Sequence, residues 1–129
     1  MKRKLQSKEK GTFAELHAAA YLRRKGCMLL ARNYAYRGGE IDIIAQDTEG
    51  RIIFAEVKSS WKIGKEPLYR LSRKKQFRIW RTACHYLHHH ADSNHLSRFD
   101  ALLIHIQNFI PHIKHYPGAF ESAYVIPMS

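Results

Sequence analysis

The sequence predicts an α/β fold in which helices cover both faces of a mixed β-sheet. Three patterns support this prediction: a hairpin spans residues 39–58, helical patterns flank it at residues 11–25 and 72–88, and a β-rich segment occupies residues 99–106. With a strand before the hairpin, the order is helix, three strands, helix, strand, which is typical of a sheet packed between helices. A chain of 129 residues is long enough for one domain with a substantial core.

The chain before the hairpin divides into an arm, a helix and a strand. Residues 1–10 are rich in lysine and predict a flexible basic arm, which leaves residues 11–129 as the single domain. We predict a helix over residues 11–25 because most of its residues are apolar, and Gly26 can adopt the left-handed conformation that ends a helix. Residues 28–34 predict the first strand.

The turn of the hairpin fixes which residues of its two arms are opposed. The three-residue loop Thr48-Glu49-Gly50 needs a left-handed third residue, and Gly50 adopts that conformation without steric cost. The loop places Asp47 opposite Arg51, so the numbers of opposed residues sum to 98.

This register brings charges of like sign together. Asp42 is expected opposite Glu56, and Lys58 opposite Glu40, with opposed Cβ atoms about 4.5–5.5 Å apart. One face of the hairpin is apolar throughout and the other in part, so both arms are expected to be covered, and ionised carboxylates there are costly without compensation. A divalent cation would supply that compensation. The alternative is a structural contact in which Lys58 simply pairs with Glu40 or Glu56.

The second half of the chain predicts a helix, a strand and an irregular tail. Ser72 is a suitable N-cap for a helix through about His88. The stripe of this helix expected to be buried consists of Phe77, Trp80, Ala83, Cys84 and Leu87. Residues 98–100 are expected to anchor the strand at 99–106, and the tail is expected to end in a short strand at 123–126.

The charge of the chain is large and uneven. A net charge of +11 and an isoelectric point near 9.9 indicate a polyanionic partner, either nucleic acid or an anionic membrane surface. Residues 1–81 carry a net +12 and residues 82–129 a net −1, which predicts a basic binding face. Nucleic acid is favoured because no membrane-anchoring amphipathic helix is predicted. The side chains expected to contact phosphates are Lys62, Lys65, Arg70, Arg73, Lys74, Lys75 and Arg78.

Composition also indicates a reducing, aqueous compartment. Cys27 and Cys84 are too few for a disulfide framework, no apolar run is long enough to span a membrane, and residues 1–10 lack the apolar segment of a secretory signal. We therefore expect a cytoplasmic protein with no membrane partner. The histidines between residues 85 and 95 are expected to be solvated rather than zinc ligands.

Three side chains each leave two interpretations open. Glu15 lies on an otherwise apolar face of the first helix, so it either reaches solvent at the helix edge or is a further carboxylate aimed at the hairpin. Trp61 and Tyr69 lie among lysines and arginines, so they either stack on bases or pack the loop.

The charged residues of the hairpin resemble the core motif of the PD-(D/E)xK nuclease superfamily. The match consists of Asp42, then Glu56-Val57-Lys58 as the E-x-K signature, with Glu15 on the preceding helix. The resemblance implies the restriction-endonuclease-like fold and a phosphodiester hydrolysis whose catalytic residues are Glu15, Asp42, Glu56 and Lys58. Asp42, Glu56 and the Val57 carbonyl would hold Mg²⁺ or Mn²⁺. Lys58 would orient or help to deprotonate the attacking water.

A longer, ordered set of segments resembles the YraN family of small bacterial proteins. The segments are G-T-F-A-E-x-x-A-A-x-Y-L from Gly11, A-R-N-Y from Ala31, G-E-I-D-I-I-A from Gly39, F-A-E-V-K from Phe54, the basic helix start ending in Lys75, and R-F-D from Arg98. The match extends from about Gly11 to Phe120. This resemblance implies an endonuclease-like protein, and the superfamily adds structured or branched DNA as an implied substrate.

The sequence therefore predicts a metal-dependent, endonuclease-like protein that acts on DNA. The alternative is a nucleic-acid-binding protein that retains the nuclease fold without catalysis. The acidic residues separate these two predictions, because carboxylates repel phosphates unless a metal neutralises them. The oligomeric state is open, and a homodimer is one assembly that the sequence allows.

Overall fold

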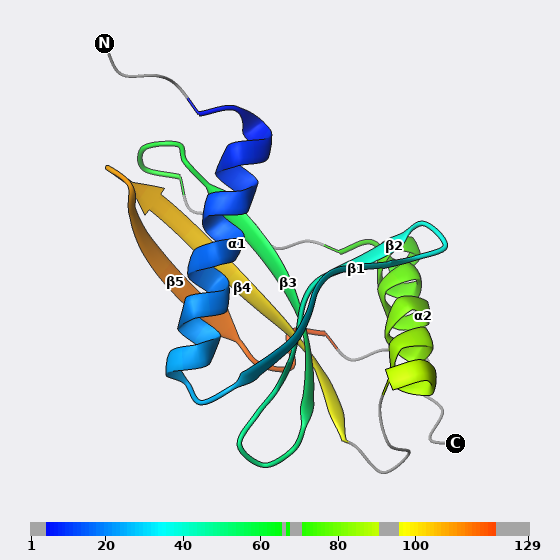
Figure 1. The fold of residues 1–129 in the computed structure, drawn as a ribbon. Coiled ribbons are helices and arrows are strands. Elements are labelled where there is room, and N and C mark those ends of the chain that lie inside the picture. The colour runs from blue at the N-terminus through cyan, green and yellow to red at the C-terminus, as the bar shows by residue number, and fades with distance from the viewer. Residues whose placement is uncertain (1–4, 66, 68–70, 91–95, 121–129) are drawn as a thin grey trace.

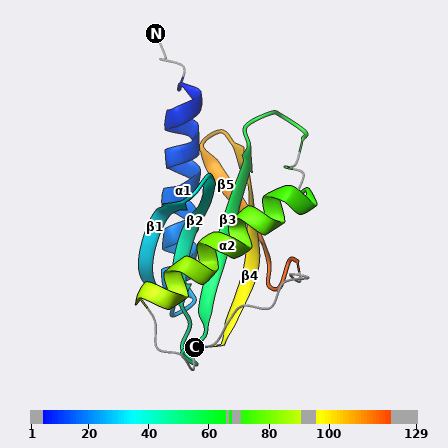
Figure 2. The same ribbon diagram turned by 90° about the vertical axis from the view of Figure 1, so that its right-hand side faces the viewer.

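A computed structural model describes residues 5–65, 67, 71–90 and 96–120 of the chain. They form a five-stranded sheet with one helix on each face (Figure 1; turned by 90° in Figure 2). The helices and strands are α1 (Ser7–Arg24), β1 (Met28–Tyr36), β2 (Gly39–Gln46), β3 (Ile52–Ser60), α2 (Arg73–His90), β4 (Ser97–Gln107) and β5 (Ile110–Tyr116). The predicted α/β class, a mixed sheet flanked by helices, is confirmed. Neither helix in this part of the chain is long and apolar enough to cross a membrane.

The strands lie in the sheet in chain order, β1-β2-β3-β4-β5. All neighbours are antiparallel except β3 and β4, which are parallel. Antiparallel neighbours can be joined by short turns, whereas a parallel pair needs a crossover, and α2 lies in the connection between β3 and β4. This crossover carries α2 across the face of the sheet (Figure 2), and the Lys75 side chain of its first turn reaches Glu56 on β3.

Each helix buries a different face of the sheet. The residues of α1 that are buried are small or slender, namely Ala14, Ala18, Ala19 and Leu22, and they pack on a face that includes Ile43, Ile53, Ala55, Leu102 and Ile104. The opposite face packs against Ile79, Ala83 and Tyr86 of α2 and includes Ile41, Ile44, Ile52, Phe54 and Phe99. Both faces of the central strands are therefore covered over much of their length, as predicted.

The start of α1 differs from the prediction, whereas the start of α2 agrees with it. Helix α1 begins at Ser7 rather than at residue 11, because the Glu9 carboxylate accepts a hydrogen bond (3.0 Å) from the backbone N–H of Gln6 and stabilises an earlier start. Four residues of the predicted basic arm are thus helical, and residues 1–4 lie outside the described part of the chain. Helix α2 is capped by Ser72 as predicted, since the Ser72 hydroxyl accepts a hydrogen bond (3.1 Å) from the N–H of Lys75.

The predicted buried stripe of α2 was largely wrong. The buried residues are Ile79, Thr82, Ala83 and Tyr86, so among the predicted residues Ala83 alone is fully buried. The physical reason is Gly39 at the start of β2: a Cβ atom there would lie 2.3 Å from the Thr82 hydroxyl and 2.5 Å from the Arg78 carbonyl. The helix approaches the sheet through this glycine, which turns Thr82 inward.

The tail prediction missed β5. Its strand carries Pro111, which removes a backbone donor, but β5 is an edge strand where that loss is tolerated. The hairpin from β4 turns at Asn108 and Phe109, both with positive φ (51° and 61°), without the glycine that usually marks such a turn. The strand predicted at 123–126 lies outside the described residues.

The predicted hairpin register is confirmed over the paired part of β2 and β3. The pairs are Ile43–Ala55, Ile44–Phe54, Ala45–Ile53 and Gln46–Ile52. The ladder ends at Ile43–Ala55, so the expected pairing of Asp42 with Glu56 and of Glu40 with Lys58 does not continue the ladder. The two strands separate beyond this point, because β2 turns toward α2.

Candidate functional site

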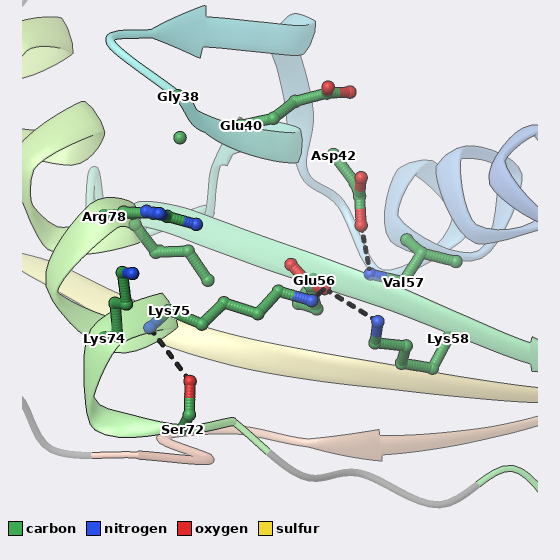
Figure 3. A pocket seen from close by; sticks show the side chains of 12 residues that line it. Gly38, Glu40, Asp42, Glu56, Val57, Lys58, Ser72, Lys74, Lys75 and Arg78 are labelled. Carbon is green, nitrogen blue, oxygen red and sulfur yellow. Dashed lines mark hydrogen bonds and ion pairs between the residues drawn. The ribbon is translucent and has the colours of Figure 1, made fainter.

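A cavity of about 530 Å³ opens where β2 and β3 separate, beside the first turn of α2 (Figure 3). It is lined by Gly38, Gly39, Glu40, Asp42, Glu56, Val57, Lys58, Ser72, Lys74, Lys75, Arg78 and Ile79. Among the residues predicted for a site, the structure thus brings together Asp42, Glu56, Val57, Lys58, Lys74, Lys75 and Arg78. The lining comes from β2, β3, α2 and the turn before β2, which are distant in the sequence.

Asp42 is half-buried on β2 and carries little compensation for its charge. Its Oδ2 accepts a hydrogen bond of 2.7 Å from the backbone N–H of Val57. Burial raises the pKa of Asp42 to about 7, the charges of Glu56, Glu15 and Glu40 act in the same direction, and the Val57 hydrogen bond opposes them. The negative charges around Asp42 therefore disfavour its ionised form.

Glu56 is the opposite case, because two lysines balance its charge. Its side chain is 10% exposed, and its Oε1 lies 3.4 Å from the Nζ of Lys58 and 3.3 Å from the Nζ of Lys75. Burial acts to lower the pKa of Lys75, but contacts with Lys58 and Glu56 and the charge of Asp42 outweigh burial and raise it. Both lysines remain partly exposed, so their ammonium groups border the cavity (Figure 3).

The contact between Lys75 and Glu56 was not predicted from the sequence. Lys75 was predicted to contact phosphates, and the spacing of residues 56 and 75 does not indicate that they meet, because a crossover connection separates them. Of the two pairings open for Lys58, the structure contains the one with Glu56, whereas Glu40 is exposed and points away from Lys58 (Figure 3).

Glu15 fits neither of its two predicted roles fully. It is 21% exposed on α1, and its Oε2 lies 3.3 Å from the Nη2 of Arg32 on β1. It does not line the cavity, although its charge contributes to the raised pKa of Asp42. The side-chain amide of Asn33 can donate to both Glu15 and Glu40, at 3.3 and 3.2 Å. Glu15 is thus held by Arg32 of β1 and lies outside the cavity lining.

The first turn of α2 carries only basic charge toward this region. Arg73, Lys74 and Lys75 occupy it with no acidic residue. Backbone N–H groups at a helix N-terminus already attract anions, so lysines and arginines there are unfavourable for the isolated helix. This arrangement destabilises the helix but favours the binding of an anion at its N-terminus.

The remaining predicted basic residues are placed differently. Lys62 and Lys65 are exposed in the loop after β3 and do not line the cavity, and Arg73 is exposed at the start of α2. Arg70 and Tyr69 lie outside the described residues. The sequence missed Gly38, Gly39, Ser72 and Ile79 as lining residues, because only the close approach of β2 to α2 at Gly39 brings them together.

The oxygen atoms that line the cavity are the kind of ligand that a hard cation prefers, but few residues supply them. Asp42, Glu56 and the Val57 carbonyl offer oxygen atoms only, which are the ligands that Mg²⁺ and Mn²⁺ prefer. Within the described ranges, no three His, Cys, Asp or Glu side chains are grouped closely enough to hold a metal ion. Mg²⁺ usually keeps several waters and needs one or two carboxylates, so this set fits it.

Other charged and aromatic residues serve the fold. Asp100 is fully buried and accepts hydrogen bonds from Arg98 (2.7 and 2.9 Å) and from the Gly118 N–H (3.0 Å), and it lies 2.7 Å from His115 Nε2. The anchoring role predicted for residues 98–100 matches these contacts. Trp61 packs against Phe13 and Phe109, with ring centroids 5.2 and 5.6 Å away, which favours loop packing over base stacking.

Among the described histidines at the end of α2, His88, His89 and His90 are exposed as predicted, whereas His85 is partly buried. The His85 Nδ1 lies 2.7 Å from the Tyr34 hydroxyl, and the His85 ring stacks on Tyr36 with centroids 3.9 Å apart. His85 therefore joins α2 to β1, while His88 to His90 are exposed, and residues 91–95 lie outside the described part.

Comparison with known proteins identifies relatives in several bacteria. Residues 14–104 match the model of "Uncharacterised protein family UPF0102". UPF0102 proteins of Geobacter metallireducens and Clostridioides difficile are 38% and 39% identical to this chain, over 93% and 90% of it and 98% and 100% of their own lengths. A UPF0102 protein of Trichlorobacter lovleyi is 35% identical over 88% of this chain and 91% of its own length.

Among solved structures, SfsA of Pyrococcus furiosus in complex with Ca²⁺ matches 84% of this chain and 62% of its own, with 13% identity and a TM-score of 0.36. A TM-score this low establishes neither a shared fold nor a shared activity. The sequence matches are of another kind, since they cover nearly the whole chain. This chain belongs to the UPF0102 family, which agrees with the YraN-like resemblance of its motifs.

Proposed function

We propose that this protein is a metal-dependent nuclease that hydrolyses phosphodiester bonds of DNA in the cavity between β2, β3 and α2. The observation that carries the proposal is the contrast between two neighbouring carboxylates. Glu56 is balanced by two lysines at 3.3 and 3.4 Å, whereas burial, reinforced by neighbouring carboxylates, raises the pKa of Asp42 to about 7. A cation bound beside Asp42 would reverse that penalty.

Asp42, Glu56 and the Val57 carbonyl are the groups that would hold Mg²⁺ or Mn²⁺. When bound, such an ion activates water and neutralises charge on a phosphoryl group. The Val57 N–H fixes the orientation of the Asp42 carboxylate, since it donates to one of its two oxygens. Because Val57 also packs against the core on the α1 side, this stretch of β3 is a rigid support for the ligands.

Lys58 and Lys75 are the groups that would act on the substrate. Both contact the same oxygen of Glu56, so that carboxylate holds two ammonium groups at the edge of the cavity. One ammonium can orient the attacking water, and both can stabilise the negative charge that develops on the phosphate. Glu15 is a positioning residue in this proposal. Arg32 holds it outside the cavity lining, and its charge acts on Asp42 without contact to the substrate.

The basic first turn of α2 would bind the substrate backbone. Lys74 and Arg78 line the cavity, and the helix N-terminus adds its own positive potential. A phosphate at this position would explain why lysines and arginines occupy a helix start that they destabilise. DNA is the proposed substrate because the resemblance to the nuclease superfamily implies it.

The test is cleavage of plasmid, single-stranded and branched DNA with Mg²⁺ or Mn²⁺, with EDTA as the metal-free control. We expect Lys58→Ala to lower the cleavage rate by about 10²-fold or more, with DNA affinity almost unchanged and a modest loss of melting temperature, because Glu56 keeps Lys75 as its second partner. Lys25→Ala is the matched control, because Lys25 is an exposed lysine just after α1 and lies outside the cavity lining. Wild-type protein that cleaves none of these substrates, or equal cleavage by the Lys58 variant, would reject the proposal.

A second candidate is a DNA-binding protein without catalysis. Two observations favour it: Glu56 is already neutralised within the protein, and the part of the chain that the structure describes groups no three side-chain metal ligands. In that case the wild-type protein would bind DNA but cleave none of the substrates, and Lys58→Ala would lower only the melting temperature, because Glu56 loses one of its two lysine partners. Metal-dependent cleavage by the wild type thus separates the two candidates.

A further inference from the structure

A second cavity, here named the β5 groove, lies over β4 and β5. Its volume is about 610 Å³, which is in the range of ligand-binding pockets. Leu103 and Ile113 are among its apolar lining residues, and His105, His112, Lys114 and Tyr116 are among its polar ones. Gly64 and Pro67 of the loop after β3 border it.

The sheet register joins this groove to the proposed active site. Three rows of paired residues cross β3, β4 and β5 in order: Glu56–Ala101–Tyr116, Lys58–Leu103–Lys114 and Ser60–His105–His112. Paired residues in a sheet point to the same face, so Tyr116, Lys114 and His112 share the face of Glu56 and Lys58. In each row, the residue on β3 and the residue on β5 are two strand spacings apart, which is about 10 Å.

This part of the sheet is left uncovered by α2. The helix packs against β1 and β2, and the buried cluster on its side of the sheet reaches Phe99 on β4 but none of the groove residues. On β5, His112, Lys114 and Tyr116 are exposed, while Ile113 and His115 alternate with them toward α1. Tyr116 is 46% exposed, so its ring is accessible to a ligand in the groove.

The chemistry of the groove favours an anionic partner with flat rings. None of the described residues that line it is acidic, and Lys114 and His112 can donate hydrogen bonds to phosphate oxygens, whereas the His105 Nε2 already lies 3.1 Å from the Lys62 carbonyl. Tyr116 can stack on a base, and the apolar Leu103 forms part of the floor. On β4, between the two sites, Ala101 is fully buried and Leu103 is 9% exposed, so the open part of the groove lies over β5.

We propose that the β5 groove binds a single-stranded segment of the nucleic acid whose phosphodiester bond lies at Lys58. This inference rests on the proposed function and names the substrate more narrowly. Stacking on Tyr116 requires an unpaired base, because the face of a paired base is covered by its neighbours in a duplex. The strand would pass above the largely buried Leu103 between Lys58 and Lys114, and it would leave the protein at the edge strand β5.

The first experiment measures binding in EDTA, so that it does not depend on cleavage. A fluorescein-labelled single strand of about 12 nucleotides and a blunt duplex of equal length are titrated by anisotropy at several salt concentrations. We expect Tyr116→Ala and Lys114→Glu each to weaken single-strand binding about tenfold, with Lys114→Glu also reducing the salt slope by about 0.7. Arg24→Glu, an exposed charge reversal at the end of α1, is the matched control and should have a smaller effect.

A second measurement needs no variant. The wild-type protein is photo-crosslinked to the same strand carrying 4-thiothymine, and the modified peptide is identified by mass spectrometry. A crosslink within residues 110–116 supports the groove, whereas crosslinks confined to other peptides overturn it. This readout keeps the proposal testable if Lys114→Glu does not fold, as judged by circular dichroism.

Three results would overturn the proposal: unchanged single-strand binding in folded groove variants, an equal loss of duplex binding, or equal affinity for polyglutamate as an anionic peptide. These failures are distinguishable from failure of the proposed function. If no metal supports cleavage but strands crosslink to β5, the nuclease proposal fails and the groove stands. If cleavage depends on Lys58 while the groove variants bind normally, the groove fails alone.

Discussion

Asp42 on β2 and Asp100 on β4 lie on strands of the same sheet but in opposite electrostatic surroundings. Burial acts to raise the pKa of Asp100, yet hydrogen bonds with His115, Arg98 and the Gly118 N–H outweigh burial and lower it to about 2. Asp42 has one backbone hydrogen bond, and burial together with neighbouring carboxylates raises its pKa to about 7. One aspartate is fully compensated by the protein and the other is not.

This difference separates a structural region from a candidate functional one. The contacts of Asp100 tie β4 to β5 and to Gly118 beyond it, so its charge stabilises the fold. The charge of Asp42 costs folding free energy in the absence of a ligand. Perturbed acids that the fold leaves uncompensated occur preferentially at functional sites, which is why the proposal centres on the cavity of Asp42.

The largest expected effect is on the structural side of this comparison. Asp100→Asn removes the buried charge that pairs with the partly exposed Arg98, so we expect the free energy of unfolding at pH 7 to fall by about 3 kcal/mol. Urea unfolding would measure it. A loss below about 1 kcal/mol would mean that this network is no stronger than a surface ion pair.

The same aspartate predicts acid sensitivity of the wild-type protein. Its pKa is lower in the folded state than the ordinary value near 4, so the unfolded state binds the proton first as the pH falls. The stabilisation by Asp100 is therefore present above about pH 4 and is lost between about pH 4 and pH 2. The stability of Asp100→Asn should depend less on pH across this window.

The network of Asp100 also shows what the sequence could not predict. Arg98 and Asp100 form a local motif, so an anchoring role was foreseeable, but His115 belongs to a strand that Pro111 and the glycine-free turn concealed. The groove on β5 was missed for the same reason. In contrast, the hairpin register followed from one turn, because a fixed loop length determines every pair in the ladder.

The site was predictable where its residues share a strand or a hairpin. Asp42, Glu56 and Lys58 converge as expected, because alternation along a strand places residues two apart on one face. The pairing of Lys75 with Glu56 was not predictable, since it depends on how α2 crosses the sheet. That crossing depends on Gly39, because a side chain there would collide with the Thr82 hydroxyl. The sequence does not reveal this contact, since Gly39 and Thr82 are far apart in the chain.

The next effect concerns how the site is held against α2. Gly39→Ala places a methyl group 2.3 Å from the Thr82 hydroxyl and 2.5 Å from a backbone carbonyl. Since backbone cannot yield easily, we expect a loss of about 1–3 kcal/mol in unfolding free energy. Gly11→Ala is the control, because a Cβ there meets no atom within 4 Å and alanine should stabilise α1 by about 0.5–1 kcal/mol. Equal effects of the two substitutions would contradict the close approach.

Asp42→Asn should act opposite to Asp100→Asn. In EDTA at pH 8, we expect the variant to be more stable than wild type by about 2 kcal/mol, after allowance for solvent screening. Asp42 binds its proton more tightly when folded, so wild-type stability falls as the pH rises from about 4 through 7. The gain should therefore disappear near pH 4, as thermal unfolding across pH would show. A destabilised variant at pH 8 would mean that Asp42 is compensated.

The smallest effect is on DNA binding by the first turn of α2. Lys74→Ala should reduce the slope of log affinity against log salt by about 0.9 for duplex DNA, which corresponds to one phosphate contact. Lys25→Ala, at the far end of α1, should leave the slope unchanged. Identical slopes for both variants would place the phosphate-binding face away from the cavity.

The central claim is that Asp42, whose charge the protein leaves uncompensated, is a ligand of a divalent cation. Calorimetric titration with Mn²⁺ tests it most directly, using wild type, Asp42→Asn and, as a matched acidic control, the exposed Glu49→Gln. We predict one site in the wild type and in Glu49→Gln, no site in Asp42→Asn, and a Mn²⁺-dependent rise in melting temperature only where the site is present. Equal Mn²⁺ binding by wild type and Asp42→Asn would contradict the claim.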